Sequence, residues 1–169
     1  RFALAKDTYI FSKNLKLTWE PRCTYHGFRY IQLEGYEGKP NIDAIKTQIV
    51  RTDLDVTGSF KSSNPFLNKL HKAIMWTEFS NLLGVPTDCP QRAERMGWLN
   101  DMTARSEELI YNFNVSRFLP KWLRDINDSQ ELITGAISDT APFRWGARPG
   151  DPVCICNVII PWLLYKHYG

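Results

Sequence analysis

The stretch SNPFLNKLHKAIMWTEFSNLLG, residues 63–84, divides the chain into two parts of different character. Proline is favoured in the first turn of a helix, where its missing N–H costs nothing, so Ser63-Asn64-Pro65 predicts a helix start. The apolar residues that recur at helical spacing up to Gly84 are Leu67, Leu70, Ile74 and Leu82, with Trp76 and Phe79 alongside. We therefore predict the first long helix of the chain here.

The residues before this stretch have the composition of β-strands. RCTYHGFRYIQLEGY (residues 22–36) is rich in Thr, Tyr, Phe and Ile, and two glycines interrupt it. IKTQIVRTD (residues 45–53) alternates apolar and polar residues. No helical period appears in this part, so residues 1–60 are predicted to form a β segment.

The residues after residue 84 have the pattern of further helices joined by long loops. A second helix is expected to begin at Asp101, and a fourth is expected over residues 153–168. Between them, residues 115–128 carry an apolar stripe, and Pro120 should kink that helix or mark its true start. Residues 133–152 are dense in Gly and Pro and predict a loop. Strands followed by helices indicate an α+β chain, divided into residues 1–60 and 61–169.

The composition narrows the function classes. Apolar residues make up 43% of the 169 residues and aromatic residues 13%, which is typical of globular proteins. The net charge of +3 is small and unclustered, so neither nucleic acid nor a membrane surface is an expected partner. No apolar run is long enough to cross a membrane, and no nucleotide-binding fingerprint is present. No cofactor is predicted.

The cysteines and histidines give no recognised site. Cys154, Cys156 and His167 could be imagined around a metal ion, but their spacing matches no known ligand pattern. We therefore predict no metal and interpret the cysteines, which also include Cys23 and Cys89, as buried free thiols. His26, His71 and His167 lack a nucleophile context and are interpreted as surface or core-edge residues.

The stretch PTDCPQRAERMGWLND, residues 86–101, mixes both charge signs with Cys, Met and Trp between two helical patterns. Its carboxylates are Asp88, Glu94 and Asp101, while Trp98 and Trp145 stand in loop-like contexts. Glycoside hydrolysis uses a pair of carboxyl groups, one that donates a proton and one that activates water or attacks the sugar. Surface salt bridges beside a helix start, with Trp98 as a core anchor, would explain the same residues, and spacing alone leaves both interpretations open.

The same stretch resembles the signature of the bacterial α-L-rhamnosidases of glycoside hydrolase family 78, typically PTDCPQRDERxGWxGD. Residues 21–36 resemble the β-sandwich segment that precedes the catalytic barrel in that family, and residues 57–72 resemble the linker strand and first barrel helix. KWLRDINDSQ, GAISDTAPFRWGARPGDP and IPWLLYKHYG resemble later stretches in the right order. The resemblance implies the last strands of a β-sandwich followed by the first helices of an (α/α) six-hairpin barrel, incomplete in this chain.

What the resemblance implies about function is the removal of terminal α-L-rhamnose from glycosides or polysaccharides by an inverting acid/base mechanism. Glu94 matches the general acid of the family. The residues that match or adjoin its rhamnose subsite are Asp88, Arg92, Trp98, Asp101, Trp145 and Asp151. Ala93 stands where an acidic residue is common, and Cys154 stands where an aromatic residue is expected, so both departures bear on sugar specificity.

The family's catalytic base is a Glu later in the barrel, so this chain is expected to carry the acid without the base. The chain begins at Arg1 without Met, and we expect both ends to be cuts within a longer protein, whose remaining barrel would be a partner. The compartment, bacterial cytoplasm or periplasm, is left open. Two alternatives also stay open: a carbohydrate-binding or inactive homologue, and a related α/α-barrel glycosidase with another sugar specificity.

Overall fold

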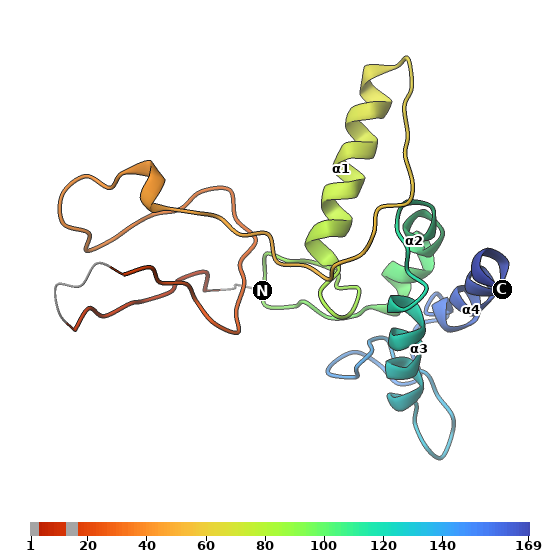
Figure 1. Ribbon diagram of the computed structural model, residues 1–169. Helices are drawn as coiled ribbons and strands as arrows, with labels where there is room; N and C mark the ends of the chain where they lie inside the picture. The colour runs from red at the N-terminus through yellow and green to blue at the C-terminus, as the bar shows by residue number, and fades with distance from the viewer. Residues whose placement is uncertain (1–3, 13–16) are drawn as a thin grey trace.

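A computed structural model describes residues 4–12 and 17–169 of the chain (Figure 1). Its elements are a short 3-10 helix η1 (Ile42–Ala44) and four helices, α1 (Pro65–Asn81), α2 (Leu99–Asn112), α3 (Phe118–Asp128) and α4 (Cys156–Tyr168). Helices α2, α3 and α4 lie together, whereas α1 extends away from them and the described residues among the first fifty run as long open excursions to one side (Figure 1). The helical half therefore holds the packed part of the chain.

Helix α1 begins where the sequence predicts it. Asn64 is the N-cap, and its side-chain oxygen accepts a hydrogen bond from the Phe66 N–H at 2.9 Å, while Pro65 occupies the first turn. The helix ends at Asn81, and Gly84 follows with a φ of 76°, a left-handed conformation that glycine adopts without steric cost. Much of its predicted apolar face is uncovered, since Leu70 and Trp76 are 47% and 48% exposed.

The hydrophobic core is built from the other three helices. α2 and α3 both pack against α4, and their fully buried side chains include Leu99, Met102, Leu109, Leu119, Trp122 and Ile160. The stripe predicted over residues 115–128 is confirmed, because Val115, Phe118, Trp122 and Ile126 are buried and Leu123 packs against them. Pro120 marks the start of α3 rather than a kink, since it lies in the first turn.

The remaining helix predictions hold within a few residues. α2 begins at Leu99, two residues before the expected start, and α4 begins at Cys156 rather than Val153. Residues 133–152 form a loop, as the Gly and Pro content indicates. No helix in the described part of the chain is long and apolar enough to cross a membrane.

The strands expected in residues 1–60 are not formed among the described residues of that segment. Val56 forms an isolated bridge with Phe113, and Leu54 is the single buried residue among positions 4–12 and 17–60. A strand needs a neighbour to receive its backbone hydrogen bonds, and the described residues of this segment form no ladder with one another. The β-sandwich therefore stays a prediction.

The cysteine prediction is right for three residues and wrong for one. Cys89, Cys154 and Cys156 are buried free thiols, whereas Cys23 is exposed in the segment that lacks a core. Burial raises the pKa of Cys154 to about 11 and that of Cys156 to about 12, so both stay neutral thiols.

A buried ion pair joins α1 to α2 below the loop that connects them. The guanidinium of Arg105 donates from Nη1 to both carboxylate oxygens of Glu78, at 3.0 and 3.2 Å, and from Nη2 to the Thr87 carbonyl at 3.1 Å. Glu78 is only 2% exposed, and this burial raises its pKa, against the opposing effect of Arg105. The pair fixes the connecting loop to both helices.

We predict that Arg105→Met destabilises the chain by about 3–5 kcal/mol near neutral pH, because it leaves the Glu78 carboxylate buried without a partner. A carboxyl group whose pKa is raised by folding favours the folded state below its unfolded pKa and loses that contribution as pH rises. The deficit should therefore shrink when urea unfolding is repeated near pH 5. The double variant Glu78→Gln/Arg105→Met should recover part of the loss at neutral pH. An equal deficit at both pH values would show that packing, not charge, is lost.

Candidate active site

The connection between α1 and α2, residues 82–98, reverses the chain at Gly84 and returns it to the end of α1. Leu82 and Pro86 form an isolated bridge across this turn. Thr87 then docks on Asn81, since its N–H and its hydroxyl both donate to the Asn81 carbonyl, at 2.8 and 3.1 Å. The residues that follow Thr87 consequently start from a fixed, buried anchor.

Asp88 and Met96 close the middle of this connection into a ring. The Asp88 N–H donates to the Met96 carbonyl at 3.0 Å, and the Met96 N–H donates to Asp88 Oδ1 at 2.8 Å. The other Asp88 oxygen, Oδ2, lies 3.7 Å from Nη2 of Arg92. The side chain of Asp88 is only 7% exposed. Arg92 and Glu94 therefore sit on a loop that is closed at its base.

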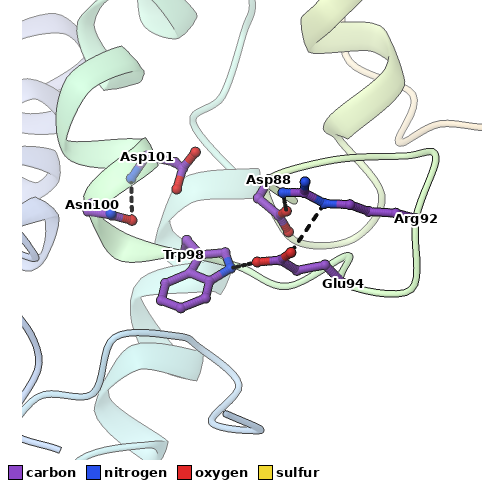
Figure 2. Close-up of a pocket in the computed structure, with 6 residues that line it drawn as sticks. All are labelled: Asp88, Arg92, Glu94, Trp98, Asn100 and Asp101. Atoms are coloured by element: carbon purple, nitrogen blue, oxygen red, sulfur yellow. Dashed lines mark hydrogen bonds and ion pairs between the residues drawn. The ribbon is translucent and has the colours of Figure 1, made fainter. Parts of the chain in front are cut away.

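The Glu94 carboxylate is held from two sides. Trp98 donates from its indole Nε1–H to Glu94 Oε1 at 3.0 Å, and Arg92 Nε lies 3.2 Å from Glu94 Oε2 (Figure 2). The Glu94 side chain is 15% exposed, whereas that of Arg92 is 47% exposed. Glu94 is therefore fixed in orientation by a mostly sheltered indole and by a more accessible guanidinium.

The first turn of α2 supplies the facing side. Trp98 is the N-cap residue, and Asp101 lies in the first turn, where a negative charge is favoured by the exposed N–H groups. Partial burial raises the pKa of Asp101, Arg105 opposes this, and the nearby negative charge of Asp88 adds to the increase. Asp101 consequently takes up a proton more readily than an ordinary aspartate.

These residues enclose a hollow of about 260 Å³, here named the acidic hollow. Its lining residues are Asp88, Arg92, Glu94, Trp98, Asn100 and Asp101 (Figure 2). Pockets for drug-sized ligands have volumes of about 300–1,000 Å³, so this hollow suits one small ring. Carboxylates, an amide and a guanidinium can bond hydroxyl groups there, while the indole offers an apolar face.

The sequence predicted five of these residues together, namely Asp88, Arg92, Glu94, Trp98 and Asp101. Asn100 was missed, although its place between Trp98 and Asp101 in the motif was a signal that it could share their position. The structure brings all six to one place through a contiguous stretch of chain, which explains why a local motif identified most of them.

A second loop, residues 129–155, docks against the start of α2. The backbone of Gly97 and Ala141 is joined by a 2.9 Å hydrogen bond, and the indole of Trp122 donates to the Ala141 carbonyl at 2.9 Å. A Cβ atom at Gly97 would collide with that carbonyl, so only glycine allows so close an approach. This contact places the second loop beside Trp98.

Asp139 organises the second loop, and sequence reasoning assigned it no role. Its carboxylate accepts backbone hydrogen bonds from Ala147 at 2.6 Å and from Asp151 at 2.8 Å. Burial by itself would raise its pKa, but these hydrogen bonds outweigh that effect and lower it. Gly146 and Gly150 leave room for the carboxylate, since a Cβ at either would lie within 3.0 Å of Asp139.

The loop brings Trp145 next to the acidic hollow. Its ring centroid lies 5.7 Å from that of Trp98, with the rings at 79° to each other. Trp145 also lines a second hollow of about 360 Å³, here named the Arg144 hollow, together with Ala93, Glu94, Met96 and Arg144. Glu94 is thus the residue that both hollows share.

Two residues singled out in the sequence lie away from both hollows. Asp151 is exposed, and its carboxylate accepts a hydrogen bond from the Val153 N–H at 3.0 Å. Cys154 is buried, with its thiol 3.5 Å from Asp139 Oδ1. Neither residue lines a hollow in this structure, and a sugar-binding role for Asp151 stays a prediction. Cys154 contacts the loop that carries Trp145 through Asp139.

The ligand atoms of Asp88, Cys89 and Glu94 lie within 4.8 Å of one another, a spacing that could suit a metal ion. Arg92 already places its guanidinium against both of these carboxylates. Burial also raises the pKa of Cys89, which favours the neutral thiol over the thiolate that binds metals. The charge balance of this group therefore fits an organic ligand with hydroxyl groups better than a cation.

The three histidines lie outside both hollows. His26 is bonded to Asp7 at 2.9 Å, His71 Nε2 lies 3.0 Å from the Asn112 amide oxygen, and the exposed His167 packs its ring on Tyr111. Their contacts agree with the interpretation of these residues as surface or core-edge histidines.

Comparison with known proteins gives matches along most of the chain. Residues 55–169 match the model of the bacterial alpha-L-rhamnosidase 6 hairpin glycosidase domain, and residues 1–51 match that of the bacterial alpha-L-rhamnosidase concanavalin-like domain. An alpha-L-rhamnosidase from Streptomyces avermitilis is 40% identical over 174 residues, which span all of this chain and 16% of that protein. One from Formosa agariphila is 34% identical over 171 residues, covering 95% of this chain and 18% of that protein.

Solved structures of similar proteins have the same fold over the matched part. The alpha-L-rhamnosidase from Dictyoglumus thermophilum superimposes with a TM-score of 0.84 at 45% identity, covering 87% of this chain and 17% of that one. The Streptomyces avermitilis enzyme in complex with L-rhamnose gives a TM-score of 0.82 at 39% identity, covering 88% of this chain and 14% of that one. The chain thus spans less than a fifth of these relatives.

We predict that Asp139→Ala loosens the loop that carries Trp145, because two backbone N–H groups lose a charged acceptor. Tryptic cleavage after Arg144 should become about tenfold faster or more, as expected from hydrogen bonds to a charged group. Asp139→Asn keeps one acceptor oxygen and should be intermediate. Asp128→Ala, at the exposed end of α3, is the matched control. Equal cleavage rates for all three variants would exclude this role of Asp139.

Proposed function

Because this chain belongs to the bacterial α-L-rhamnosidase family, we propose that its acidic hollow binds a terminal α-L-rhamnose unit for hydrolysis. The observation that carries the proposal is the position of Glu94 at the junction of the two hollows, with its carboxyl group oriented by Trp98. A general acid must reach the oxygen that links the sugar to its leaving group, and that oxygen lies between their two binding sites.

The groups around the acidic hollow match what a rhamnose ring requires. We propose that Asp88, Asp101 and Arg92 bond its hydroxyl groups, and that the indole of Trp98 packs on a C–H face of the ring. Asn100 adds an amide that can donate and accept hydrogen bonds. Arg92 is a more exposed partner of Glu94 than Trp98 is, so it can turn from the carboxylate towards sugar hydroxyls when a substrate enters.

The proposed reaction inverts the configuration of the sugar. Glu94 gives its proton to the glycosidic oxygen as the bond from that oxygen to the anomeric carbon breaks. Water attacks the anomeric carbon from the opposite face and loses its proton to a second carboxylate. We propose that this base comes from a part of the barrel outside the present chain, because the other two carboxylates that line the acidic hollow, Asp88 and Asp101, are proposed to bind the sugar.

The chain by itself is therefore proposed to be half of an active site. It would supply the general acid and the rhamnose subsite, and residues 1–60 would belong to the end of a β-sandwich that precedes the barrel. Rhamnose-containing glycosides or polysaccharides are the proposed substrates, and the remainder of the barrel is the proposed partner. The relatives it matches are about six times longer, since it spans 16% and 18% of the first two.

One observation favours a carbohydrate-binding or inactive homologue instead. Arg92 contacts the Glu94 carboxylate directly at 3.2 Å, whereas a proton-donating carboxyl group must be neutral when the substrate is bound. Turnover distinguishes the two functions, since a binding module would hold rhamnose without releasing it from a glycoside.

We predict that Glu94→Gln, in a protein that carries this chain with the rest of the barrel, lowers kcat/KM on alkyl rhamnosides about 10²–10⁴-fold. Glutamine keeps the size and the bond from Trp98 but has no proton to transfer. An alkoxide leaving group needs that proton, whereas a nitrophenolate is stable without it. The loss on a nitrophenyl rhamnoside should consequently be much smaller.

Glu107→Gln is the matched control for this experiment, because Glu107 lies on the exposed face of α2 and binds Tyr111 outside the hollow. Its kinetics should equal those of the unchanged protein on both substrates. If Glu94→Gln lost the same factor on both substrates, Glu94 would be a binding or structural residue. If it lost nothing on either, the assignment of the general acid would be wrong.

A further inference from the structure

The Arg144 hollow differs in chemistry from the acidic hollow that it adjoins. Its lining has an aromatic face from Trp145, small or apolar surface from Ala93 and Met96, one cation and one carboxyl group. Only Glu94 among these could accept a hydrogen bond from a hydroxyl group through its side-chain carboxyl. This lining has few groups that can bond rhamnose hydroxyls. It suits a ligand that carries a negative charge and has a ring that can pack on an indole.

Arg144 differs from the neighbouring arginines Arg92 and Arg148 in the contacts of its guanidinium group. Arg148, on the same loop, donates to the Ser129 carbonyl at 2.6 Å and stacks on Phe143 with its guanidinium carbon 4.3 Å from the ring centroid. Arg92 is paired with Glu94. Within the described ranges, residues 4–12 and 17–169, the exposed Arg144 side chain makes neither a hydrogen bond nor an ion pair.

Because Glu94 lines both hollows, its proposed role indicates what the Arg144 hollow would bind. A general acid that protonates the glycosidic oxygen has the departing sugar on one side and its leaving group on the other. If the acidic hollow holds rhamnose, the Arg144 hollow is where the leaving group lies. We infer that this hollow selects leaving groups whose first unit carries a carboxylate, that is a uronic acid residue, an inference that rests on the proposed function.

The charge state during the reaction strengthens this selection. Glu94 must carry its proton when the substrate is bound, so it is then neutral. Among the described residues that line its hollow, Arg144 is at that moment the one charged side chain. The carboxylate of a uronic acid would pair with this guanidinium, and its pyranose ring would lie on the Trp145 face, which is 53% exposed.

Ala93 bears on the same selectivity. It is exposed on the rim of the Arg144 hollow, where an acidic side chain would place a negative charge close to the guanidinium. Such a charge would pair with Arg144 and repel a uronate. The alanine at this position therefore leaves the positive charge of the hollow available to a ligand.

The test compares a rhamnosyl-uronate disaccharide with its methyl ester, which has the same rings but no charge. The protein is one that carries this chain with the rest of the barrel, and a nitrophenyl rhamnoside reports rhamnosidase activity itself. We expect kcat/KM to be higher for the free acid than for the ester by about two- to fivefold at low ionic strength, and less at high salt.

Arg144→Gln should bring the ratio of kcat/KM for acid over ester to about one, and Ala93→Asp should lower that ratio while Arg144 remains. Arg124→Gln, on the exposed face of α3, is the matched control and should leave the ratio unchanged.

The outcomes separate the two claims. Turnover of the nitrophenyl rhamnoside with equal kcat/KM for acid and ester overturns the uronate inference and leaves the proposed function standing. A preference for the acid that survives Arg144→Gln also overturns the inference, because another residue would then recognise the carboxylate of the uronic acid. Failure to hydrolyse any of the three substrates removes the proposed function and the inference with it.

Discussion

The pair of hydrogen bonds between Asp88 and Met96 is the constraint on which the rest of the site depends. It closes the loop that carries Arg92 and Glu94, and it uses the backbone of Asp88 as well as one of its carboxylate oxygens. The closure brings Glu94 back towards the Trp98 indole, to which its carboxylate is bonded. A single aspartate thus fixes the geometry of the loop, and its second oxygen, which is buried, lies 3.7 Å from the Arg92 guanidinium.

The closed loop is held from both sides by packed structure. On one side, Arg105 ties Thr87 to the buried carboxylate of Glu78, so the residue before Asp88 cannot shift independently of α1 and α2. On the other side, Gly97 lies directly on the Ala141 carbonyl, which also accepts a hydrogen bond from Trp122 in the core. A flexible acid would sample unproductive orientations, whereas one braced in this way keeps its direction at little entropic cost when a substrate binds.

Much of the site could be predicted from sequence because it is local. Asp88, Arg92, Glu94, Trp98 and Asp101 lie within fourteen consecutive positions, and a helix start at Leu99 is enough to bring them together. Asp139 and Arg144 could not be found in this way, because their positions follow from docking of a loop that is distant in sequence. No spacing pattern encodes such a contact.

The same distinction between local and long-range contacts separates the parts of the fold that could be predicted from those that could not. The start of α1 at Asn64-Pro65 and the stripe of α3 follow from capping and helical period, which are properties of a few neighbouring residues. The strands predicted in residues 1–60 depend on partners that their own sequence does not specify, and no ladder forms among the described residues of that segment. Local rules identified the helices, while the β-sandwich depends on long-range pairing.

The central claim is that the acidic hollow holds rhamnose with its anomeric oxygen at Glu94. A crystal structure of L-rhamnose bound to a protein that carries this chain and the rest of the barrel tests it most directly. The account predicts the ring against Trp98, hydroxyl groups in hydrogen-bonding contact with Asp88 and Asp101, and the anomeric oxygen about 3 Å from the Glu94 carboxyl group. An ordered rhamnose bound with its anomeric oxygen beyond hydrogen-bonding reach of Glu94 would contradict it.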